Sequence, residues 1–177
     1  MNARNWFRRY VEHTPCAKVR LVLEFFVVFA RFEYALKNAP NLPGNQNYVE
    51  PNWRQFALDD NHIKDFDAIV LKDERIGNAV EYLINNPPKV LGINNGRLVW
   101  TARQDFRYGK SSLGRAILHL KDVRNNLFHG SKNALLPEDP QGHRDEKLLK
   151  SALKVLYALV DLDPEVRRAF LHGYPER

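Results

Sequence analysis

Cysteine is almost absent from this chain: Cys16 is the only one among 177 residues. A single cysteine allows no disulfide bond within the chain, so a disulfide-stabilised secreted module is excluded. His13 stands nearby, but no second pair of histidine or cysteine follows at the spacing of zinc ligands. We therefore expect a reducing, cytoplasmic setting, no metal site and no cofactor.

Long apolar runs are missing as well. The longest, Leu21 to Ala30, is interrupted by Glu24 and is too short to cross a bilayer. The first residues lack the apolar stretch and the small-residue cleavage site of a secretory signal peptide. We expect a protein with no membrane association.

The chain does have ample core material and an excess of positive charge. Hydrophobic residues make up 44% of the sequence, including ten Phe, seven Tyr and three Trp. This is enough apolar volume for a folded core, and the length suits one domain over residues 1–177. Lys and Arg exceed Asp and Glu by 27 to 21, which gives a net charge of +6. A basic excess favours polyanionic partners, nucleic acid first.

The spacing of apolar residues predicts an all-α helical bundle. Thr14-Pro15 begins a helix that runs to Asn38 and is apolar almost all round, as expected at the centre of a bundle. Ser111 or Ser112 caps a later helix, and Asp163-Pro164 begins the last one. The helices are expected over residues 14–38, 52–58, 60 or 65 to 84, 112–128, 143–162 and from 163 to before Gly173.

One segment departs from the helical pattern. Residues 89–101 hold two short apolar runs separated by Asn94-Asn95-Gly96. The Asn-Gly pair tolerates the positive φ angles of a tight hairpin turn. We expect a small β-hairpin inserted into the helical scaffold.

A charged residue stands within an apolar stripe of the helix expected over residues 112–128. At about 100° per residue, Arg124 falls on the face that this helix turns toward the core. The apolar residues of that face are Leu113, Ala116, Ile117, Leu120, Val123 and Leu127. A guanidinium in such a place is unfavourable unless it is paired or lines a cavity. Arg124 is therefore either half of a structural ion pair or part of a site.

His129 follows five residues later, at the expected C-terminal end of the same helix. The helix dipole favours a protonated imidazole there. In a regular helix, His129 would lie roughly 140° around from Arg124. The two side chains converge only if the helix ends or unwinds near Leu127 or Phe128, or if another subunit supplies the partner groups. Gly130 makes the first arrangement reasonable.

The segment Arg124-Asn125-Asn126-Leu127-Phe128-His129 resembles the Arg-x4–6-His motif of the HEPN superfamily, the higher eukaryote and prokaryote nucleotide-binding domains. Asn125 is the polar residue that this family often carries directly after the arginine. The motif stands near the end of a late helix and precedes another long helix, as in the family. Arg31-Phe32-Glu33-Tyr34, in the long first helix, is similar to the family too. The inserted hairpin has no counterpart in the minimal family fold.

The resemblance implies a homodimer in which the motifs of two protomers meet and cleave RNA without a metal. Arg124, His129 and Asn125 are then the catalytic residues. A role in a toxin–antitoxin or phage-defence system is implied as well, with an antitoxin or another regulatory protein as a further partner.

The chemistry of RNA cleavage suits these residue types. RNA carries its own nucleophile, the 2′-OH, so cleavage needs a base for that proton, an acid for the leaving 5′-oxygen and positive charge for the phosphate. Histidine transfers protons near neutral pH, and arginine holds phosphate through paired N–H donors. Two copies of each in a dimer supply a sufficient set. The expected products are a 2′,3′-cyclic phosphate and a 5′-hydroxyl.

A basic and aromatic stretch precedes the motif helix, and it is suited to following an RNA backbone and stacking on a base. A solvated loop is the alternative interpretation. Together with two residues from elsewhere in the chain, the candidates for RNA binding are Arg31, Arg103, Arg107, Tyr108, Lys110 and Lys132. Arg31 also forms a polar line with Arg20 and Glu24, which is directed either at solvent or at a site within the bundle.

Other interpretations stay open. His129 and Gly130 form only a helix cap in one of them, while Arg124 pairs with a buried acid such as Glu24. The chain is then a non-catalytic HEPN-like module that binds RNA or protein through its dimer or basic face. A purely structural adaptor is a third class. A nucleotide-binding P-loop ending at Gly109-Lys110-Ser111 is rejected, because Gln104 stands where its first glycine belongs.

Overall fold

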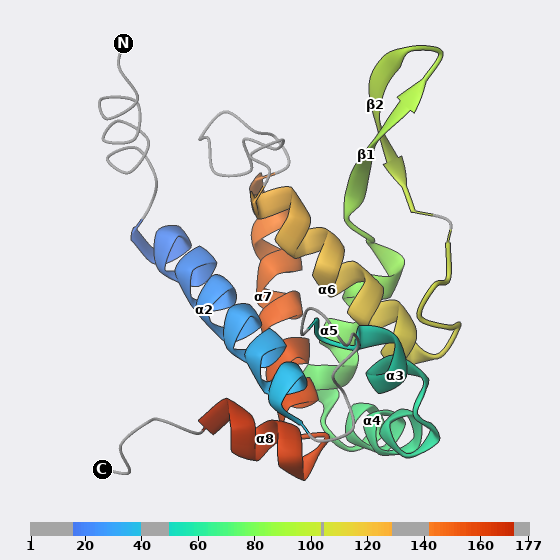
Figure 1. Cartoon of the computed structure of the whole chain (residues 1–177). Helices are drawn as coiled ribbons and strands as arrows, with labels where there is room; N and C mark the ends of the chain where they lie inside the picture. The colour runs from blue at the N-terminus through green and yellow to red at the C-terminus, as the bar shows by residue number, and fades with distance from the viewer. Residues whose placement is uncertain (1–15, 40–49, 104, 129–141, 172–177) are drawn as a thin grey trace.

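The computed structural model describes residues 16–39, 50–103, 105–128 and 142–171. Over these residues the chain is mostly helical and carries one small antiparallel sheet (Figure 1), so the predicted helical architecture with a hairpin is confirmed. The helices are α2 (Cys16–Asn38), α3 (Trp53–Leu58), α4 (Asp60–Lys72), α5 (Glu74–Asn85), α6 (Ser112–Phe128), α7 (Gly142–Val160) and α8 (Pro164–Leu171); the strands are β1 (Lys89–Asn94) and β2 (Arg97–Ala102).

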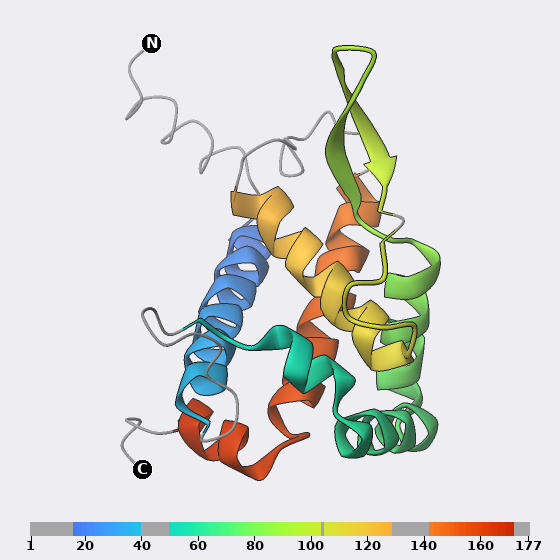
Figure 2. The same ribbon diagram turned by 45° about the vertical axis from the view of Figure 1, so that its right-hand side comes forward.

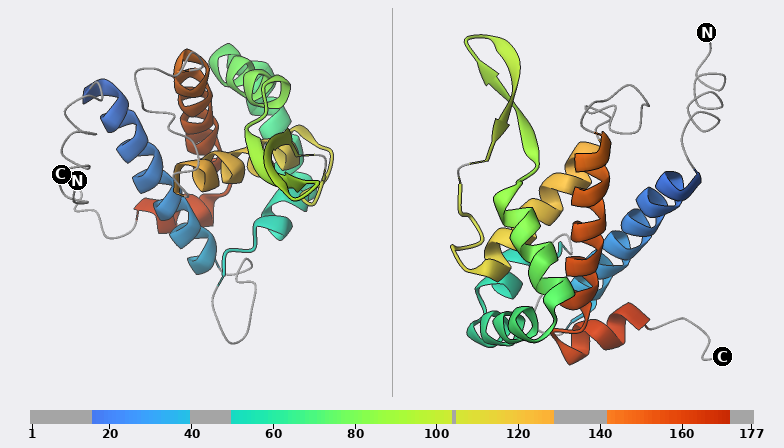
Figure 3. Two further views of the ribbon diagram at one scale, coloured as in Figure 1. Left: turned by 90° about the horizontal axis from the view of Figure 1, so that it is seen from above. Right: turned by 180° about the vertical axis from the view of Figure 1, so that it is seen from behind.

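Helix α7 lies at the centre of the bundle. It packs against α5 on one side and α2 on the other, as the view from above shows (Figure 3), and α6 packs against both α5 and α7. The short helix α8 lies across the end of α2, and the hairpin projects from the opposite end of the bundle (Figure 2). Within the described ranges, no helix combines the length and the hydropathy that a membrane-spanning segment requires.

Aromatic side chains fill the core between α2, α3 and α4. The fully buried phenylalanines are Phe25, Phe29, Phe32, Phe56 and Phe66. The Phe32 ring meets that of Phe56 edge-on at 5.6 Å between centroids and also contacts Trp53. Each buried side chain of this size contributes about 1.5–3 kcal/mol relative to an exposed one. These aromatic contacts fix the position of α2 against α3 and α4.

Local capping and turn signals appear where the sequence predicts them. The Ser111 hydroxyl accepts a hydrogen bond from the Gly114 N–H, and Asp163 accepts from the N–H groups of the first turn of α8. In the hairpin, Asn94 pairs with Arg97 across the turn residues Asn95 and Gly96. Both turn residues have positive φ angles, 48° and 73°, as expected for this tight turn.

The single helix predicted from residue 60 or 65 to 84 is wrong, because Asp73 divides it into α4 and α5. Asp73 has an extended backbone, and its carboxylate accepts from the N–H of Arg75 at 2.9 Å, which caps α5. Hydrogen bonds from the Arg75 side chain and backbone lower the pKa of Asp73 to about 2, so the cap stays charged at neutral pH. Gly77 permits the close approach of α5 to α4 at this junction, since a Cβ there would lie 2.9 Å from the Val70 carbonyl oxygen.

A buried ion pair fastens the segment after the hairpin to α6. The Asp122 carboxylate is almost fully buried, and it accepts from Arg103 Nε at 2.9 Å and from Nη2 at 2.7 Å. The third guanidinium nitrogen, Nη1, donates to Asp105. Burial raises the pKa of Asp122, while the Arg103 hydrogen bonds oppose that shift. This bidentate pair therefore sets where the chain returns from β2 to α6.

Arg103→Ala is expected to destabilise the protein by about 3 kcal/mol, because it leaves the Asp122 carboxylate buried without its partner. Arg107→Ala is the matched control: it also removes a guanidinium bound to Asp105, but from an exposed pair, so its effect should stay within about 0.5 kcal/mol. Urea unfolding at pH 7.5 measures both. Equal losses in the two variants would show that the Arg103–Asp122 pair does not anchor this segment.

Candidate functional site

Arg124 lies near the C-terminal end of α6 and faces α2. Its Nη2 is 3.1 Å from Glu33 Oε1, and its Nη1 donates to Asn125 Oδ1 at 2.9 Å. The guanidinium carbon also lies 5.4 Å from the centre of the Phe29 ring, within range of a cation–π contact. The expectation that this arginine needs partners within the bundle is therefore met by one acid, one amide and one aromatic ring.

The Arg124–Glu33 pair is partly open to solvent. The two side chains are 30% and 23% exposed. Such a pair is neither a freely screened surface contact nor a fully desolvated one. The guanidinium is held in one orientation while part of the Arg124 side chain stays accessible, as an arginine that also binds an anion requires.

The acid suggested for Arg124 from the sequence, Glu24, has another partner. Glu24 accepts a hydrogen bond from the Tyr157 hydroxyl of α7 at 3.0 Å. Glu24 and Glu33 lie on different sides of α2, because nine residues turn a helix by about 180°. Sequence reasoning missed Glu33 as the partner. The signal that could have found it is that Glu33 is the one acid of the segment Arg31-Phe32-Glu33-Tyr34.

The second half of the predicted catalytic pair, His129, lies outside the described residues, as does Lys132. The described part of α6 reaches Phe128, the residue directly before His129. The convergence itself stays a prediction. Asn125, the third predicted catalytic residue, is in place beside Arg124.

Two of the residues expected to bind RNA, Arg103 and Tyr108, have structural roles instead. Arg103 belongs to the buried pair with Asp122. Tyr108 is buried, and the Lys121 ammonium lies 5.3 Å from the centre of its ring. Neither side chain presents a free face for stacking or for a phosphate in this arrangement.

The other residues of the basic and aromatic stretch before α6 lie on the surface. Arg107 is exposed and pairs with Asp105 at 2.6 Å. Lys110 lies over the ring of Phe106, which is itself exposed. An exposed aromatic ring with cations around it retains the character of a stacking surface for a base.

Arg31 joins α2 to α8. Its Nε donates to the Phe170 carbonyl oxygen at 2.7 Å, and its guanidinium lies 4.8 Å from the centre of the Tyr34 ring. A cation at the C-terminal end of a helix satisfies carbonyl groups that lack intrahelical donors. The polar line expected from Arg20, Glu24 and Arg31 therefore divides, since Glu24 contacts α7 and Arg31 contacts α8.

Two histidines have side chains that the structure describes, and both are part of the core or its edge. His62 contacts the Phe56 carbonyl oxygen at 3.0 Å and the Asp163 carboxylate at 3.2 Å. His119 is buried, and its Nδ1 finds no hydrogen-bond partner in the described part of the chain. Burial, with smaller contributions from Arg115 and Arg103, lowers the pKa of His119 to about 4. A group with this pKa is neutral at pH 7 and is a poor proton donor there.

Among the described residues, no group of three or more His, Cys, Asp or Glu side chains is placed to hold a metal ion. Comparison with known proteins finds no matching family model, no matching curated protein and no matching solved structure.

His119 is expected to make stability depend on pH. Its folded pKa of about 4 lies below the ordinary value of 6.5, so the unfolded chain binds the proton more tightly. Stability is then fully present above pH 6.5 and falls as the pH drops toward 4, by roughly 3 kcal/mol in all. Urea unfolding at pH 7.5, 6 and 5 should show this loss in the wild type and a smaller one in His119→Gln. Parallel losses would contradict the assignment.

Proposed function

We propose that the chain is a HEPN-type endoribonuclease that cleaves RNA without a metal and acts as a homodimer. The observation that supports this most is the state of Arg124: it is ordered by Glu33 and Asn125, partly exposed, and four residues before Phe128, the last described residue of α6. The net charge of +6 suits a polyanionic substrate. A cytoplasmic role in a toxin–antitoxin or phage-defence system, with an antitoxin or regulatory partner, belongs to the proposal through the family resemblance.

In the proposed reaction the RNA supplies the nucleophile. The 2′-oxygen attacks the adjacent phosphorus as a base takes its proton, and the bond from phosphorus to the 5′-oxygen breaks as an acid protonates that oxygen. His129 serves as base in one protomer and as acid in the other. The products are a 2′,3′-cyclic phosphate and a 5′-hydroxyl, and no water or external cofactor is consumed.

Arg124 binds the phosphate in this scheme. Its guanidinium carries five N–H donors, and it contacts Asn125 through Nη1 and Glu33 through Nη2. Donors directed at the phosphate oxygens stabilise the charge that builds up in the transition state. Glu33 and Asn125 act as positioning residues, because they fix the plane of the guanidinium before RNA arrives.

A second copy of the chain is proposed to dock beside this site, along α2. The outward face of α2 carries Leu23, Val27, Ala30 and Tyr34, at spacings of four, three and four residues. Leu23 is 61% exposed, Val27 is 53% exposed and Tyr34 is 43% exposed, which makes this an apolar stripe of the kind that helices bury against one another. Glu33 follows Ala30 by one turn, so it borders the stripe. A partner on the stripe would bring the two Arg124 sites near each other.

The Arg124–Glu33 ion pair also supports a second candidate function. Since Glu33 neutralises Arg124, a HEPN-like module that binds RNA or protein without cleaving RNA would also keep this contact. The two functions differ in what Arg124 does: catalysis requires it to contact the scissile phosphate, and the module requires only its structural pairing.

Wild-type protein is expected to cleave total RNA in the presence of EDTA. Arg124→Ala should reduce the rate at least about 100-fold through loss of transition-state charge, and His129→Ala should reduce it by roughly 100-fold or more through loss of proton transfer. Lys64→Ala, an exposed cation on α4, is the control and should cleave normally. Gel analysis of the RNA with labelled 5′-hydroxyl ends measures all four proteins.

Absence of cleavage by the wild type, or equal rates in the wild type and both variants, would leave the binding module as the better description. Circular dichroism of each variant separates loss of chemistry from loss of fold. Arg124→Lys adds a further distinction: it retains the positive charge but not the paired donors, so a large loss identifies the planar guanidinium as the requirement.

Val27→Glu is expected to dissociate the homodimer, since it places a charge in the centre of the apolar stripe. The dimer dissociation constant should rise by at least roughly 100-fold, about 3 kcal/mol, and RNA cleavage should fall with it. Leu71→Glu is the control, because Leu71 is exposed on α4, away from α2. Sedimentation velocity measures both variants. A wild type that is monomeric at micromolar concentration, or a Val27→Glu variant that remains dimeric, would refute this interface.

A further inference from the structure

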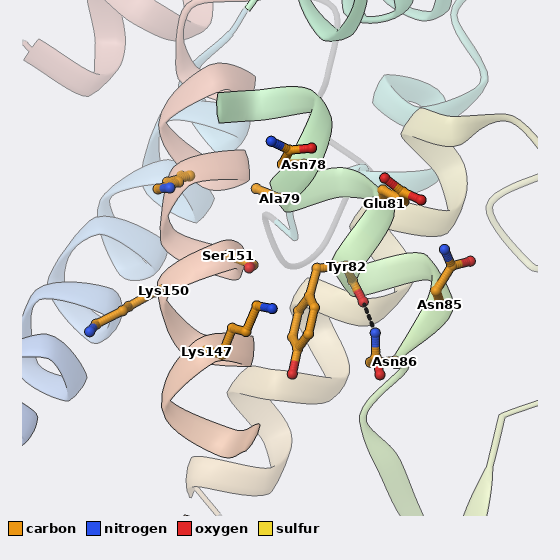
Figure 4. Close-up of a pocket in the computed structure, with 10 residues that line it drawn as sticks. Asn78, Ala79, Glu81, Tyr82, Asn85, Asn86, Lys147, Lys150 and Ser151 are labelled. Carbon is orange, nitrogen blue, oxygen red and sulfur yellow. Dashed lines mark hydrogen bonds between the residues drawn. The ribbon is translucent and has the colours of Figure 1, made fainter. Parts of the chain in front are cut away.

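A groove of about 500 Å³ lies between α5 and α7 (Figure 4). Helix α5 packs on the side of α7 that faces away from α2 (Figure 3). Its floor is formed by two small buried side chains, Ala79 from α5 and Ser151 from α7. Two closely packed helices leave a hollow between them where both contribute small residues, and the longer side chains one turn away become its walls. The groove is therefore a product of the packing of these two helices.

Three lysines of α7 form one wall of the groove. Lys147, Lys150 and Lys154 are all exposed, and they stand at spacings of three and four residues, so they share one face of the helix. The row extends along about 10 Å of the helix axis. Against these three ammonium groups the lining contains a single carboxylate, that of Glu81. The wall is thus cationic, and it is long enough to contact more than one phosphate of an extended strand.

The lysines differ in how they are held. The Lys147 ammonium lies 4.4 Å from the centre of the Tyr82 ring, and Figure 4 shows it reaching across the groove toward that ring. Lys150 is paired with Glu146 at 2.6 Å, although it is 59% exposed. Surface pairs of this kind are weak, so a phosphate can replace the carboxylate at little cost.

The opposite wall, from α5, is polar and uncharged over most of its length. Asn78, Tyr82 and Asn85 stand at spacings of four and three residues and line the groove from α5. Figure 4 shows Tyr82 beside Lys147. Carboxamides both donate and accept hydrogen bonds, which matches the mixed donors and acceptors on base edges. One wall therefore suits phosphates and the other suits bases.

From this arrangement we infer that the α5–α7 groove binds single-stranded RNA, with the backbone phosphates on Lys147, Lys150 and Lys154 and the bases toward Asn78, Tyr82 and Asn85. Phosphate contacts through a row of lysines are independent of sequence, so the groove holds RNA of varied sequence. The site is separate from Arg124, which lies on the α2 side of the bundle. Binding in the groove does not depend on whether the chain cleaves RNA.

The test uses a fluorescently labelled 12-nucleotide 2′-O-methyl RNA of mixed sequence, which lacks the nucleophilic 2′-OH and so reports binding alone. Fluorescence anisotropy measures its affinity for the full chain between 50 and 300 mM salt. Replacement of Lys147, Lys150 and Lys154 by alanine should weaken binding roughly tenfold or more near 100 mM salt. It should also reduce the slope of log affinity against log salt by about 2, as expected for three lost phosphate contacts on a single strand.

A matched triple variant removes the same charge elsewhere: Lys37→Ala on α2 with Lys64→Ala and Lys72→Ala on α4, all exposed. It should change the affinity and the slope much less than the groove variant. Replacement of the three groove lysines by arginine should preserve both. If alanine at the groove lysines impairs folding, Lys154→Glu serves instead, since it reverses one exposed charge of the row.

Equal weakening by the two alanine triples would overturn the inference, because the effect would then reflect net charge alone. Unchanged binding by the groove variant would overturn it as well. A third contrary result is that the groove variant still binds RNA but no longer binds a polyglutamate peptide that the wild type binds. This result would identify an acidic protein segment as the occupant of the groove. Cleavage assays on unmodified RNA are read separately, so failure of the groove and failure of the Arg124 chemistry are distinguishable.

Discussion

The pairing of Arg124 with Glu33 is the contact on which the candidate site depends. A guanidinium in the apolar stripe of α6 requires a counter-charge, and Glu33 of α2 supplies one. The requirement brings the polar edge of α2 against the end of α6 and leaves the apolar stripe of α2 facing outward. Asp122, half a turn earlier on α6, is held in the same manner by Arg103, so one helix contributes both to the core and to the site.

Features determined by neighbouring residues could be predicted from the sequence, and those determined by distant residues could not. The Asn95-Gly96 turn and the Ser111 and Asp163 caps were predictable because each is satisfied within a few residues. The break at Asp73 was not, since the apolar spacing continues across it and a capping aspartate resembles any surface acid. The need of Arg124 for a partner was predictable, but its identity was not, because Glu33 is 91 residues away along the chain. Arg103 was expected to bind RNA for the same reason, because its partner Asp122 lies on another element and local sequence does not reveal the pair.

The two proposed RNA contacts lie on different sides of α7. The Arg124 site lies between α6 and α2, and the lysine groove lies between α7 and α5. Such a division separates the chemistry, which needs one phosphate placed accurately, from retention of the strand, which needs several phosphates held loosely. Because α7 packs between α2 and α5, it fixes the geometry of both contacts relative to each other.

The central claim is that the RNA itself supplies the nucleophile at the Arg124 site. The most direct measurement uses an oligoribonucleotide that the wild type cuts at a known position, resynthesised with a single 2′-deoxynucleotide on the 5′ side of the cut and incubated in EDTA. The account predicts that cleavage stops at that position while cuts elsewhere in the strand continue. Continued cleavage at the 2′-deoxy position would contradict it, because the attacking oxygen would then have to come from water or from the protein.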